Sequence, residues 1–305
     1  MQLKEVCFSS SLPDTAFYAV DHKVNGERFF PGAGFLEMAC IAGNVAGEQR
    51  VRKIKDIVWV QPLIFLTGRQ TLRISLKHIR DSVEYTISSA DDDNETIVHS
   101  EGRLEFIDDW TKPARPRADT EDRIPIQALK AQCGRPRRAA DFYRKFSDYG
   151  LQYGPSFQTL QEIYINGAFA LSKLKIPDHL KGDFDQFILH PSMVDGALQT
   201  IAALAGGVDS TMPHVPFALD EVEIVHPLSQ TCYAYAEYAD SQMRNHTGAR
   251  KFNIRILNES GNLLIALRNL YVRPIGRPPT SSQSIVAADW VANGRLLSPA
   301  SAVLQ

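Results

Sequence analysis

The sequence predicts an α+β protein built from two similar halves. Two observations lead to this prediction. Each half contains one almost wholly apolar helix signal, and each helix signal is followed by a series of strand signals. Because an apolar helix has to be buried, we expect the strands of each half to form an antiparallel meander that curls around its helix. Two such units placed side by side could share one continuous sheet.

The first helix is predicted at residues 31–47, PGAGFLEMACIAGNVAG, where Pro31 suits the first helical turn. Its apolar residues surround nearly the whole circumference, so we expect the helix to be enclosed. They are Phe35, Leu36, Met38, Ala39, Ile41, Ala42 and Val45. Strands are predicted after it at 54–66, 71–79, 83–89 and 96–107. Within 71–79, Leu72, Ile74 and Leu76 alternate with polar residues, which indicates one buried face.

The second helix is predicted at residues 191–207, PSMVDGALQTIAALAGG, and it also opens on a proline, Pro191. Its apolar residues again surround the helix. They are Met193, Val194, Ala197, Leu198, Ile201, Ala202 and Leu204. The strands predicted after it are 215–228, 232–238, 251–257 and 262–272. The order of elements in the first half is therefore repeated in the second.

Two stretches rich in proline and charge set the expected boundaries. Residues 108–138 have little apolar periodicity, so we interpret them as a linker between an N-terminal half, 1–107, and a C-terminal half, 139–275. Residues 276–305 carry Pro, Ser and Gly, which is typical of an interdomain linker. We therefore expect the chain to be a piece of a longer protein whose tail leads toward a neighbouring domain.

Composition excludes several classes of function. The chain has 33 basic and 35 acidic residues and a net charge of −2, so no basic field is present for nucleic-acid binding. No apolar run is long enough to cross a membrane, and the N-terminus lacks the pattern of a signal peptide. The 4 cysteines form no pattern typical of a zinc site or a disulfide framework. A cytoplasmic protein with free thiols is expected.

His22 is the first candidate for chemistry. His22, Gly26 and Pro31 have the spacing H-x-x-x-G-x-x-x-x-P directly before the first helix. Gly26 can adopt a positive φ, which would fold a hairpin that brings His22 toward the helix start. The backbone N–H of Gly32 has no partner within the helix there and could hold an oxyanion. A purely structural role for a histidine before a turn stays open.

Asp195 is the second candidate, because it lies inside the second apolar helix with Gln199 one turn later on the same face. A carboxylate buried there would need a raised pKa or a polar partner, and Gln199 can be that partner. The alternative is an exposed aspartate in the first helical turn, favoured by the helix dipole. The residues alone leave both readings open.

A third motif is GLQYGPSFQ at residues 150–158. Its two glycines, Pro155 and aromatic residues indicate a rigid loop that presents Tyr153, whose hydroxyl could bind a substrate oxygen. The alternative is that the loop serves only for packing.

Together these motifs resemble the dehydratase domains of modular, type I, bacterial polyketide synthases, and the resemblance covers residues 1–275. Two motifs of that family are matched in full, by His22, Gly26 and Pro31 and by His190, Pro191, Asp195 and Gln199. Two others depart from the family pattern, with Leu151 in place of a tyrosine and with Val215 and Leu219 in place of a leucine and a tryptophan. The resemblance implies a double hotdog fold, in which each half wraps a sheet around one helix.

The resemblance also implies a reaction. A β-hydroxyacyl thioester, carried on the phosphopantetheine arm of an acyl carrier protein, would lose water to give the α,β-unsaturated thioester. His22 would remove the α-proton and Asp195 would protonate the departing hydroxyl. Gly32 would stabilise the enolate-like oxygen, Gln199 would orient Asp195, and Tyr153 would hold the hydroxyl. No metal and no cofactor of its own is expected.

The expected partners are an acyl carrier protein, neighbouring polyketide synthase domains and a second copy in a homodimer. Arg135, Arg137 and Arg138 could meet an acidic carrier protein, although a solvated charge run is the simpler explanation. Three other functions stay open: a bifunctional dehydratase-cyclase that forms oxygen heterocycles, a double-bond-shifting domain, and a silent domain kept for docking. Because Asp195 and Pro31 are both retained, plain dehydration is favoured.

Overall fold

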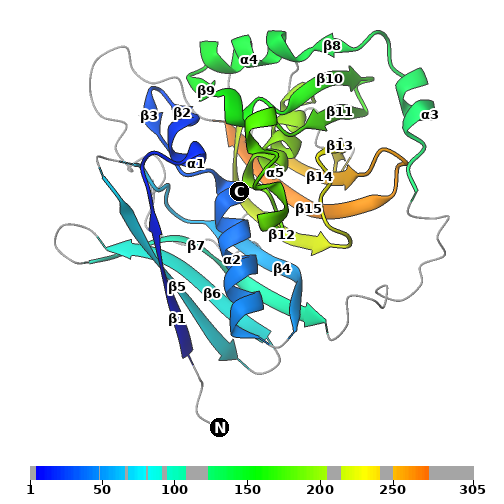
Figure 1. The fold of residues 1–305 in the computed structure, drawn as a ribbon. Helices are drawn as coiled ribbons and strands as arrows, with labels where there is room; N and C mark the ends of the chain where they lie inside the picture. Colours follow the sequence, from blue (N-terminus) through cyan, green and yellow to red (C-terminus); the bar gives the residue numbers. More distant parts are fainter. Residues whose placement is uncertain are drawn as a thin grey trace, which may run out of the picture.

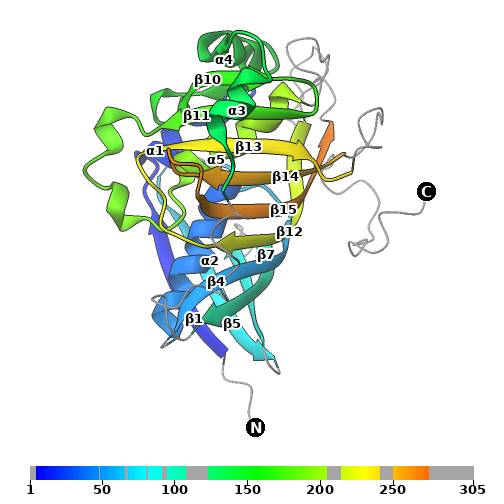
Figure 2. The ribbon, with the colours of Figure 1, turned by 90° about the vertical axis from the view of Figure 1, so that its right-hand side faces the viewer.

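A computed structural model describes residues 5–47, 49–65, 68–79, 82–90, 95–107, 123–204, 214–240 and 250–274 of the chain. Its main feature is one 12-stranded antiparallel sheet that curls around two helices, α2 (Gly32–Ala46) and α5 (Pro191–Gln199) (Figures 1 and 2). The two helices contact each other inside the curl. Both helices were predicted from the sequence, and the shared continuous sheet is confirmed.

Five strands of the sheet belong to the first half. In spatial order they are β1 (Glu5–Leu12), β5 (Gln70–Ile79), β6 (Ser82–Ala90), β7 (Thr96–Ile107) and β4 (Arg50–Trp59). The sheet continues through β12 (His214–Ile224), β15 (Leu263–Pro274), β14 (Arg250–Leu257), β13 (Thr231–Tyr238), β11 (Phe169–Lys175), β10 (Leu160–Ile165) and β8 (Arg137–Arg138). The halves meet where β4 pairs with β12.

The expectation of a simple meander after each helix is wrong. The strand directly after each helix, β4 or β12, pairs with the last strand of its own half, β7 or β15, and with its counterpart in the other half. Only the three strands that follow run as a meander. Alternating polarity predicts which segments are strands, but it does not specify which edges pair.

The core is continuous across the two halves. Leu72, Ile74 and Leu76 of β5 are buried, as their alternation predicted, and so are Phe252 and Ile254 of β14. Burial of each such side chain contributes about 1.5–3 kcal/mol, so the wrapped helices and the inner face of the sheet supply much of the folding energy.

The expected enclosure of the first helix is only partly correct. Ile41 and Val45, four residues apart on α2, are 41% and 67% exposed. They share one helical face, which neither the sheet nor α5 covers. The second helix is shorter than expected, because α5 ends at Gln199 and a 3-10 turn, η4 (Thr200–Ala203), follows it. Residues 205–207 of the predicted helix lie outside the described residues.

The remaining short elements lie outside the large sheet and its two central helices. They are α1 (Phe17–Val20), β2 (His22–Val24), β3 (Glu27–Arg28), α4 (Ala139–Asp148), β9 (Leu151–Tyr153), η1 (Pro155–Phe157), η2 (Asp178–Leu180) and η3 (Phe184–Gln186). β3, β2 and β9 form a second, 3-stranded sheet that joins the halves.

The described part of the predicted linker 108–138 is packed against the protein. It contains α3 (Ile126–Ala131), whose Ile126 is buried against the second half. Lys130 of α3 lies over the rings of Tyr164 and Tyr233, 4.8 and 4.9 Å from their centroids. Residues 108–122 and the predicted linker 276–305 lie outside the described residues. Among the helices that are described, none has the length and apolar character needed to span a membrane.

Candidate active site

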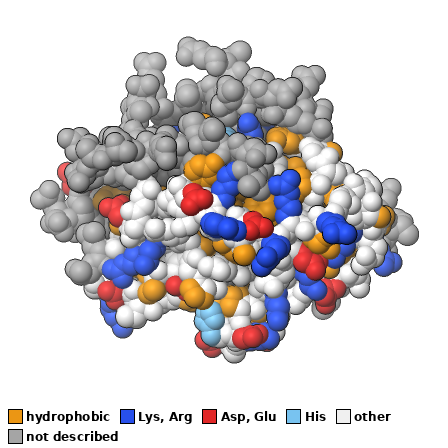
Figure 3. Space-filling model, turned by 90° about the horizontal axis from the view of Figure 1, so that it is seen from above, with side chains coloured by type: hydrophobic (Ala, Val, Ile, Leu, Met, Phe, Trp, Pro, Cys, Tyr) orange, Lys and Arg blue, Asp and Glu red, His pale blue; other side chains and the backbone are white. Residues whose placement is uncertain are grey.

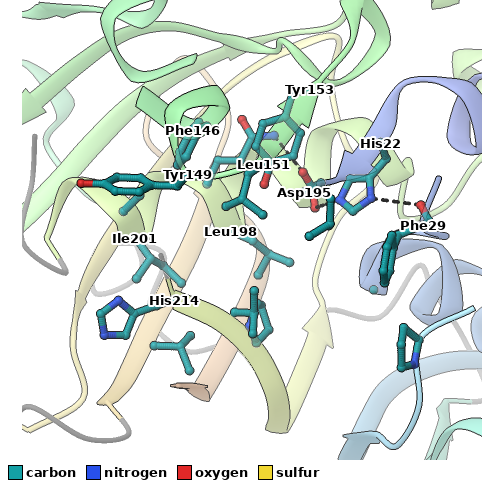
Figure 4. A pocket seen from close by; sticks show the side chains of 18 of the residues that line it. His22, Phe29, Phe146, Tyr149, Leu151, Tyr153, Asp195, Leu198, Ile201 and His214 are labelled. Atoms are coloured by element: carbon teal, nitrogen blue, oxygen red, sulfur yellow. Dashed lines mark hydrogen bonds and ion pairs between the residues drawn. The ribbon is translucent and has the colours of Figure 1, made fainter. Parts of the chain in front are cut away.

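The hairpin that carries His22 forms as predicted. β2 and β3 are joined at Asn25 and Gly26, whose φ values of 51° and 87° allow a tight turn. The hairpin places His22 Nδ1 3.0 Å from the carbonyl oxygen of Phe29 (Figure 4). Because a carbonyl only accepts hydrogen bonds, Nδ1 is the protonated nitrogen of the neutral ring. Nε2 is left as the proton acceptor.

The second half fixes the hairpin from the other side. β9 pairs with β2 so that Tyr153 lies directly opposite His22, and their ring centroids are 5.6 Å apart. The backbone N–H of Gly154 donates to the carbonyl of Asp21 at 2.7 Å, and that of Ser156 donates to the Asp21 carboxylate at 3.0 Å. The predicted loop 150–158 therefore holds the segment that presents the histidine.

Asp195 is the fifth residue of α5 and only 6% exposed. Its Oδ1 lies 3.9 Å from His22 Nε2, and its Oδ2 accepts a hydrogen bond of 2.8 Å from Gln199 Nε2. Burial raises the pKa of Asp195, while His22 and the Gln199 hydrogen bond lower it, and the net direction is upward. The alternative prediction, an exposed aspartate in the first helical turn, is therefore wrong. The loop with Tyr153 and the hairpin with His22 cover this part of the helix.

The orientation of the Gln199 amide decides which oxygen of Asp195 is free. Gln199 Nε2 also donates to the carbonyl of Phe157, at 3.1 Å. Because that carbonyl can only accept, the amide N–H groups face Phe157 and Asp195 Oδ2. A proton on neutral Asp195 therefore resides on Oδ1, the oxygen that faces His22. In the described part of the chain, the buried Gln199 Oε1 has no hydrogen-bond partner.

The paired groups open into a cavity of about 230 Å³. Of the residues predicted for the site, His22, Asp195, Gln199, Tyr153 and Gly32 line it. Most of the remaining wall is apolar and includes Phe35, Trp59, Phe142, Phe146, Leu151, Leu198 and Ile201. Such a wall suits an uncharged acyl chain.

Gly32 is the first residue of α2, where the backbone N–H has no partner within the helix. Its carbonyl accepts a hydrogen bond of 3.1 Å from Trp59 Nε1. A Cβ at this position would lie 3.2 Å from the Trp59 ring, so glycine allows the close approach of helix and indole. The helix start is thereby held in the cavity wall.

Gly26, Pro31 and Pro155, also predicted as supporting residues, do not line the cavity. Gly26 forms the turn behind His22, and Pro31 precedes α2 as its N-cap. Pro155 opens the 3-10 turn η1, whose Phe157 carbonyl orients Gln199. Each of the three shapes a backbone segment that positions a residue of the cavity wall. The lining residues that were not predicted as site residues include a second histidine, His214, the first residue of β12.

Glu37 on α2 was not predicted either, although its side chain joins the two halves. It is 3% exposed and accepts hydrogen bonds from the backbone N–H groups of Ile188 and Leu189, at 3.0 and 2.6 Å. Burial raises the pKa of Glu37, and these two hydrogen bonds oppose that shift. The signal was available in the sequence, since Glu37 interrupts an apolar helix as Asp195 does.

His190 follows Leu189 and caps α5, its Nδ1 accepting from the Ser192 N–H at 3.2 Å. Burial lowers the pKa of His190 to about 4, so the ring stays neutral. It lies among the rings of Phe17, Phe184 and Phe187. The histidine that begins the second motif therefore stabilises the start of the helix that carries Asp195.

Family models match both halves. Residues 1–90 match the model described as "Polyketide synthase dehydratase domain", and residues 121–282 match "Polyketide synthase dehydratase N-terminal domain". The chain belongs to the polyketide synthase dehydratase domains. The structures of such domains share its architecture, and the predicted double hotdog fold is confirmed.

Individual relatives support the same family assignment. The chain is 30% identical to polyketide synthase PksM of Bacillus subtilis over 88% of its own length, but it spans only 6% of that protein. It is 28% identical to the crystal structure of a trans-AT polyketide synthase dehydratase domain from Brevibacillus brevis, with a TM-score of 0.78 and coverage of 89% of this chain and 94% of that one. The dehydratase domain of the CurF module of curacin polyketide synthase has the same coverage, a TM-score of 0.79 and 21% identity.

Proposed function

We propose that this domain removes water from a β-hydroxyacyl thioester delivered by an acyl carrier protein and leaves the α,β-unsaturated thioester. The observation that carries the proposal is the pair His22 and Asp195, whose Nε2 and Oδ1 face each other 3.9 Å apart beside an apolar cavity. Elimination breaks bonds at two adjacent carbon atoms, so the base and the acid that serve it have to be close neighbours.

His22 is the base. Its Nδ1–H is held by the carbonyl of Phe29, so Nε2 carries the lone pair that takes the α-proton. The same carbonyl stabilises the imidazolium that forms. Since the electron pair of the broken C–H bond moves toward the thioester carbonyl, negative charge develops on its oxygen. The N–H at the start of α2, at Gly32, is the donor available in the cavity wall for that charge.

Asp195 is the acid. Burial raises the pKa of its carboxyl, which favours the protonated acid, and Gln199 places the proton on Oδ1. This proton passes to the β-hydroxyl as the C–O bond breaks, and water leaves. The electron pair from the α-carbon forms the new double bond. Protonated His22 and ionised Asp195 remain as an ion pair, and transfer of the proton from Nε2 to Oδ1 restores the starting state.

Tyr153 contributes a neutral hydroxyl. Burial, together with the charge of Asp195, raises the pKa of Tyr153 well above its ordinary value. The phenol therefore keeps its proton throughout the cycle and can donate a hydrogen bond to the substrate hydroxyl, in the position opposite His22 on the neighbouring strand.

The test is to supply each diastereomer of a carrier-bound β-hydroxyacyl thioester and to follow the loss of water by mass. Plain dehydration gives an α,β-alkene, which is absent with His22→Ala and with Asp195→Asn. A β,γ-alkene would identify a double-bond-shifting domain instead. A product with the starting mass and a changed retention time would identify a cyclase. If the wild-type domain converts no diastereomer, the proposed reaction is wrong and the silent docking domain is favoured.

A further inference from the structure

A second hollow adjoins the catalytic cavity. It is a groove lined by β8 and α4: its walls are Pro136, Arg137, Arg138, Asp141, Arg144, Lys145, Asp148 and Tyr149. Lys145 and Tyr149 also line the cavity that contains His22 and Asp195. The groove and the cavity are therefore adjacent along the C-terminal end of α4.

Helix α4 borders both hollows and presents different side chains to each. Phe142 and Phe146 are buried and line the catalytic cavity. Arg144 lies on the far side of the helix and lines the groove, whereas Lys145 lies between the two sides and lines both hollows, with its Nζ 5.8 Å from the centre of the Tyr149 ring. A ligand that occupies both hollows thus meets apolar rings at one end and cations at the other.

The charges of the groove are unequal. Four cations face two carboxylates, those of Asp141 and Asp148, and one cation is used internally because Arg144 pairs with Asp141. Within the described ranges, no carboxylate lies at ion-pair distance from the exposed Arg137 and Arg138. Figure 3 looks down on this side of the molecule and shows several basic side chains together with acidic ones. The groove retains positive charge for an anionic partner.

We infer that this groove receives the acyl carrier protein, with Arg137 and Arg138 on the phosphodiester through which the pantetheine arm is attached. The inference rests on the proposed function, which supplies the arm. When the acyl end lies beside His22 and Asp195, the arm leads out of the apolar cavity and its single phosphodiester lies outside it. Guanidinium groups match phosphate oxygens in shape and charge. Arg135, also named from the sequence, does not line the groove.

The experiment compares three substrates that carry the same β-hydroxyacyl group. One is a pantetheine thioester without phosphate, one is a phosphopantetheine thioester, and one is bound to the carrier protein. For the double variant Arg137→Ala, Arg138→Ala we expect kcat/KM to fall about tenfold on the two substrates that contain phosphate, and to stay unchanged on the first. The matched control is Arg73→Ala, Lys77→Ala on the exposed side of β5, which should change none of the three.

Salt gives an independent readout. Raising the ionic strength should lower kcat/KM of the wild type on the carrier-bound substrate and affect the double variant much less, because exposed charge pairs are screened. Charge reversal, Arg137→Glu with Arg138→Glu, should lower kcat/KM on the carrier-bound substrate further than the double alanine variant does. Equal losses on all three substrates, or no loss on those with phosphate, would overturn the inference.

Binding separates this inference from the proposed reaction. Fluorescence anisotropy of labelled holo carrier protein measures docking without turnover. If the wild type converts no substrate but binds the carrier in a manner that Arg137→Ala, Arg138→Ala weakens, the groove assignment holds and the proposed reaction fails. If turnover occurs and the double variant binds the carrier as the wild type does, the reaction holds and the groove assignment fails.

Discussion

Each half of the molecule buries one carboxyl group in its central helix, and the two groups have different surroundings. Glu37 of α2 accepts two backbone N–H groups from the other half, so both of its oxygens are occupied. Asp195 of α5 accepts one side-chain N–H, on Oδ2, and its Oδ1 faces His22 and the cavity. Burial raises the pKa of both. A buried carboxyl with fixed donors on both oxygens holds structure, whereas one with a free oxygen can exchange a proton.

The largest expected effect is the loss of turnover in Asp195→Asn. This change keeps shape and removes the proton that leaves with the hydroxyl, so kcat should fall by about a hundredfold to ten-thousandfold. The melting temperature should change little, because the Gln199 contact can persist. Dehydration of a carrier-bound substrate and a thermal melt check both statements. Retained turnover would show that the free oxygen of Asp195 is not the proton donor.

Glu37→Ala should mainly lower stability, whereas Asp195→Asn should mainly lower turnover. It leaves two buried N–H groups without a partner, so we expect the free energy of unfolding to fall by about 2–4 kcal/mol. Glu37→Gln retains one acceptor and should lose less. Urea unfolding measures both variants. If Glu37→Gln instead abolished turnover with unchanged stability, the division of roles between the two carboxyl groups would be wrong.

The pH dependence should follow from the same shifts. A carboxyl whose pKa is higher in the folded than in the unfolded protein stabilises the fold below its unfolded pKa, and that contribution is lost as pH rises through the folded pKa. The contribution of these two carboxyls to the free energy of unfolding should therefore fall as pH rises from their ordinary pKa values, 3.8 for Asp195 and 4.5 for Glu37, through the raised ones. It is measured as the difference between wild type and variant, because neutral His190, whose pKa is lowered to about 4, adds a dependence of the opposite sign. Asp195→Asn and Glu37→Gln should each flatten this dependence. A stability difference between wild type and Asp195→Asn or Glu37→Gln that does not change with pH over that window would contradict the shifts.

A smaller effect is expected for Gln199→Ala. The Gln199 hydrogen bond lowers the pKa of Asp195, so its loss should raise that pKa further and move the alkaline limb of the activity profile to higher pH. The proton of Asp195 is then no longer confined to Oδ1, and kcat should fall about tenfold. A rate profile over pH for both proteins tests this, and a limb that moves to lower pH would contradict it.

The smallest effect is expected at Val45→Lys. Val45 belongs to an apolar helix like the residues around Asp195, but it is 67% exposed. We expect a change below about 0.5 kcal/mol in the free energy of unfolding and none in turnover. The buried Ala39 on the same helix is the comparison, since Ala39→Lys should prevent folding at ordinary temperature.

Local patterns predicted the parts of the site that depend on nearby residues. The turn at Gly26 and the four-residue spacing of Asp195 and Gln199 are set within one hairpin and one helix. The carbonyl groups of Phe29 and Phe157 could not be recognised, because any residue supplies a carbonyl and only the fold brings it to His22 or Gln199. The family resemblance, not the pattern, linked His22 with Asp195.

Local sequence patterns also predicted the elements of the fold, but not how the two halves pair. Apolar periodicity located both helices and most strands, since burial of one face imposes it. It did not reveal that β4 and β12 pair with each other, because pairing across the halves depends on which edges meet. It also overestimated the enclosure of Ile41 and Val45, because an apolar residue on a helix does not by itself require a covering partner.

The pairing of β2 with β9 has a consequence for recombination. Each half supplies a backbone support for the other's reactive group: β9 lies against the strand of His22, and Glu37 holds the residues that lead into the helix of Asp195. A chimera that joins halves from two relatives at residues 108–122 would mismatch both supports at once. Exchange among relatives should therefore preserve these supports when the domain is moved whole and disrupt them when the crossover lies between its halves.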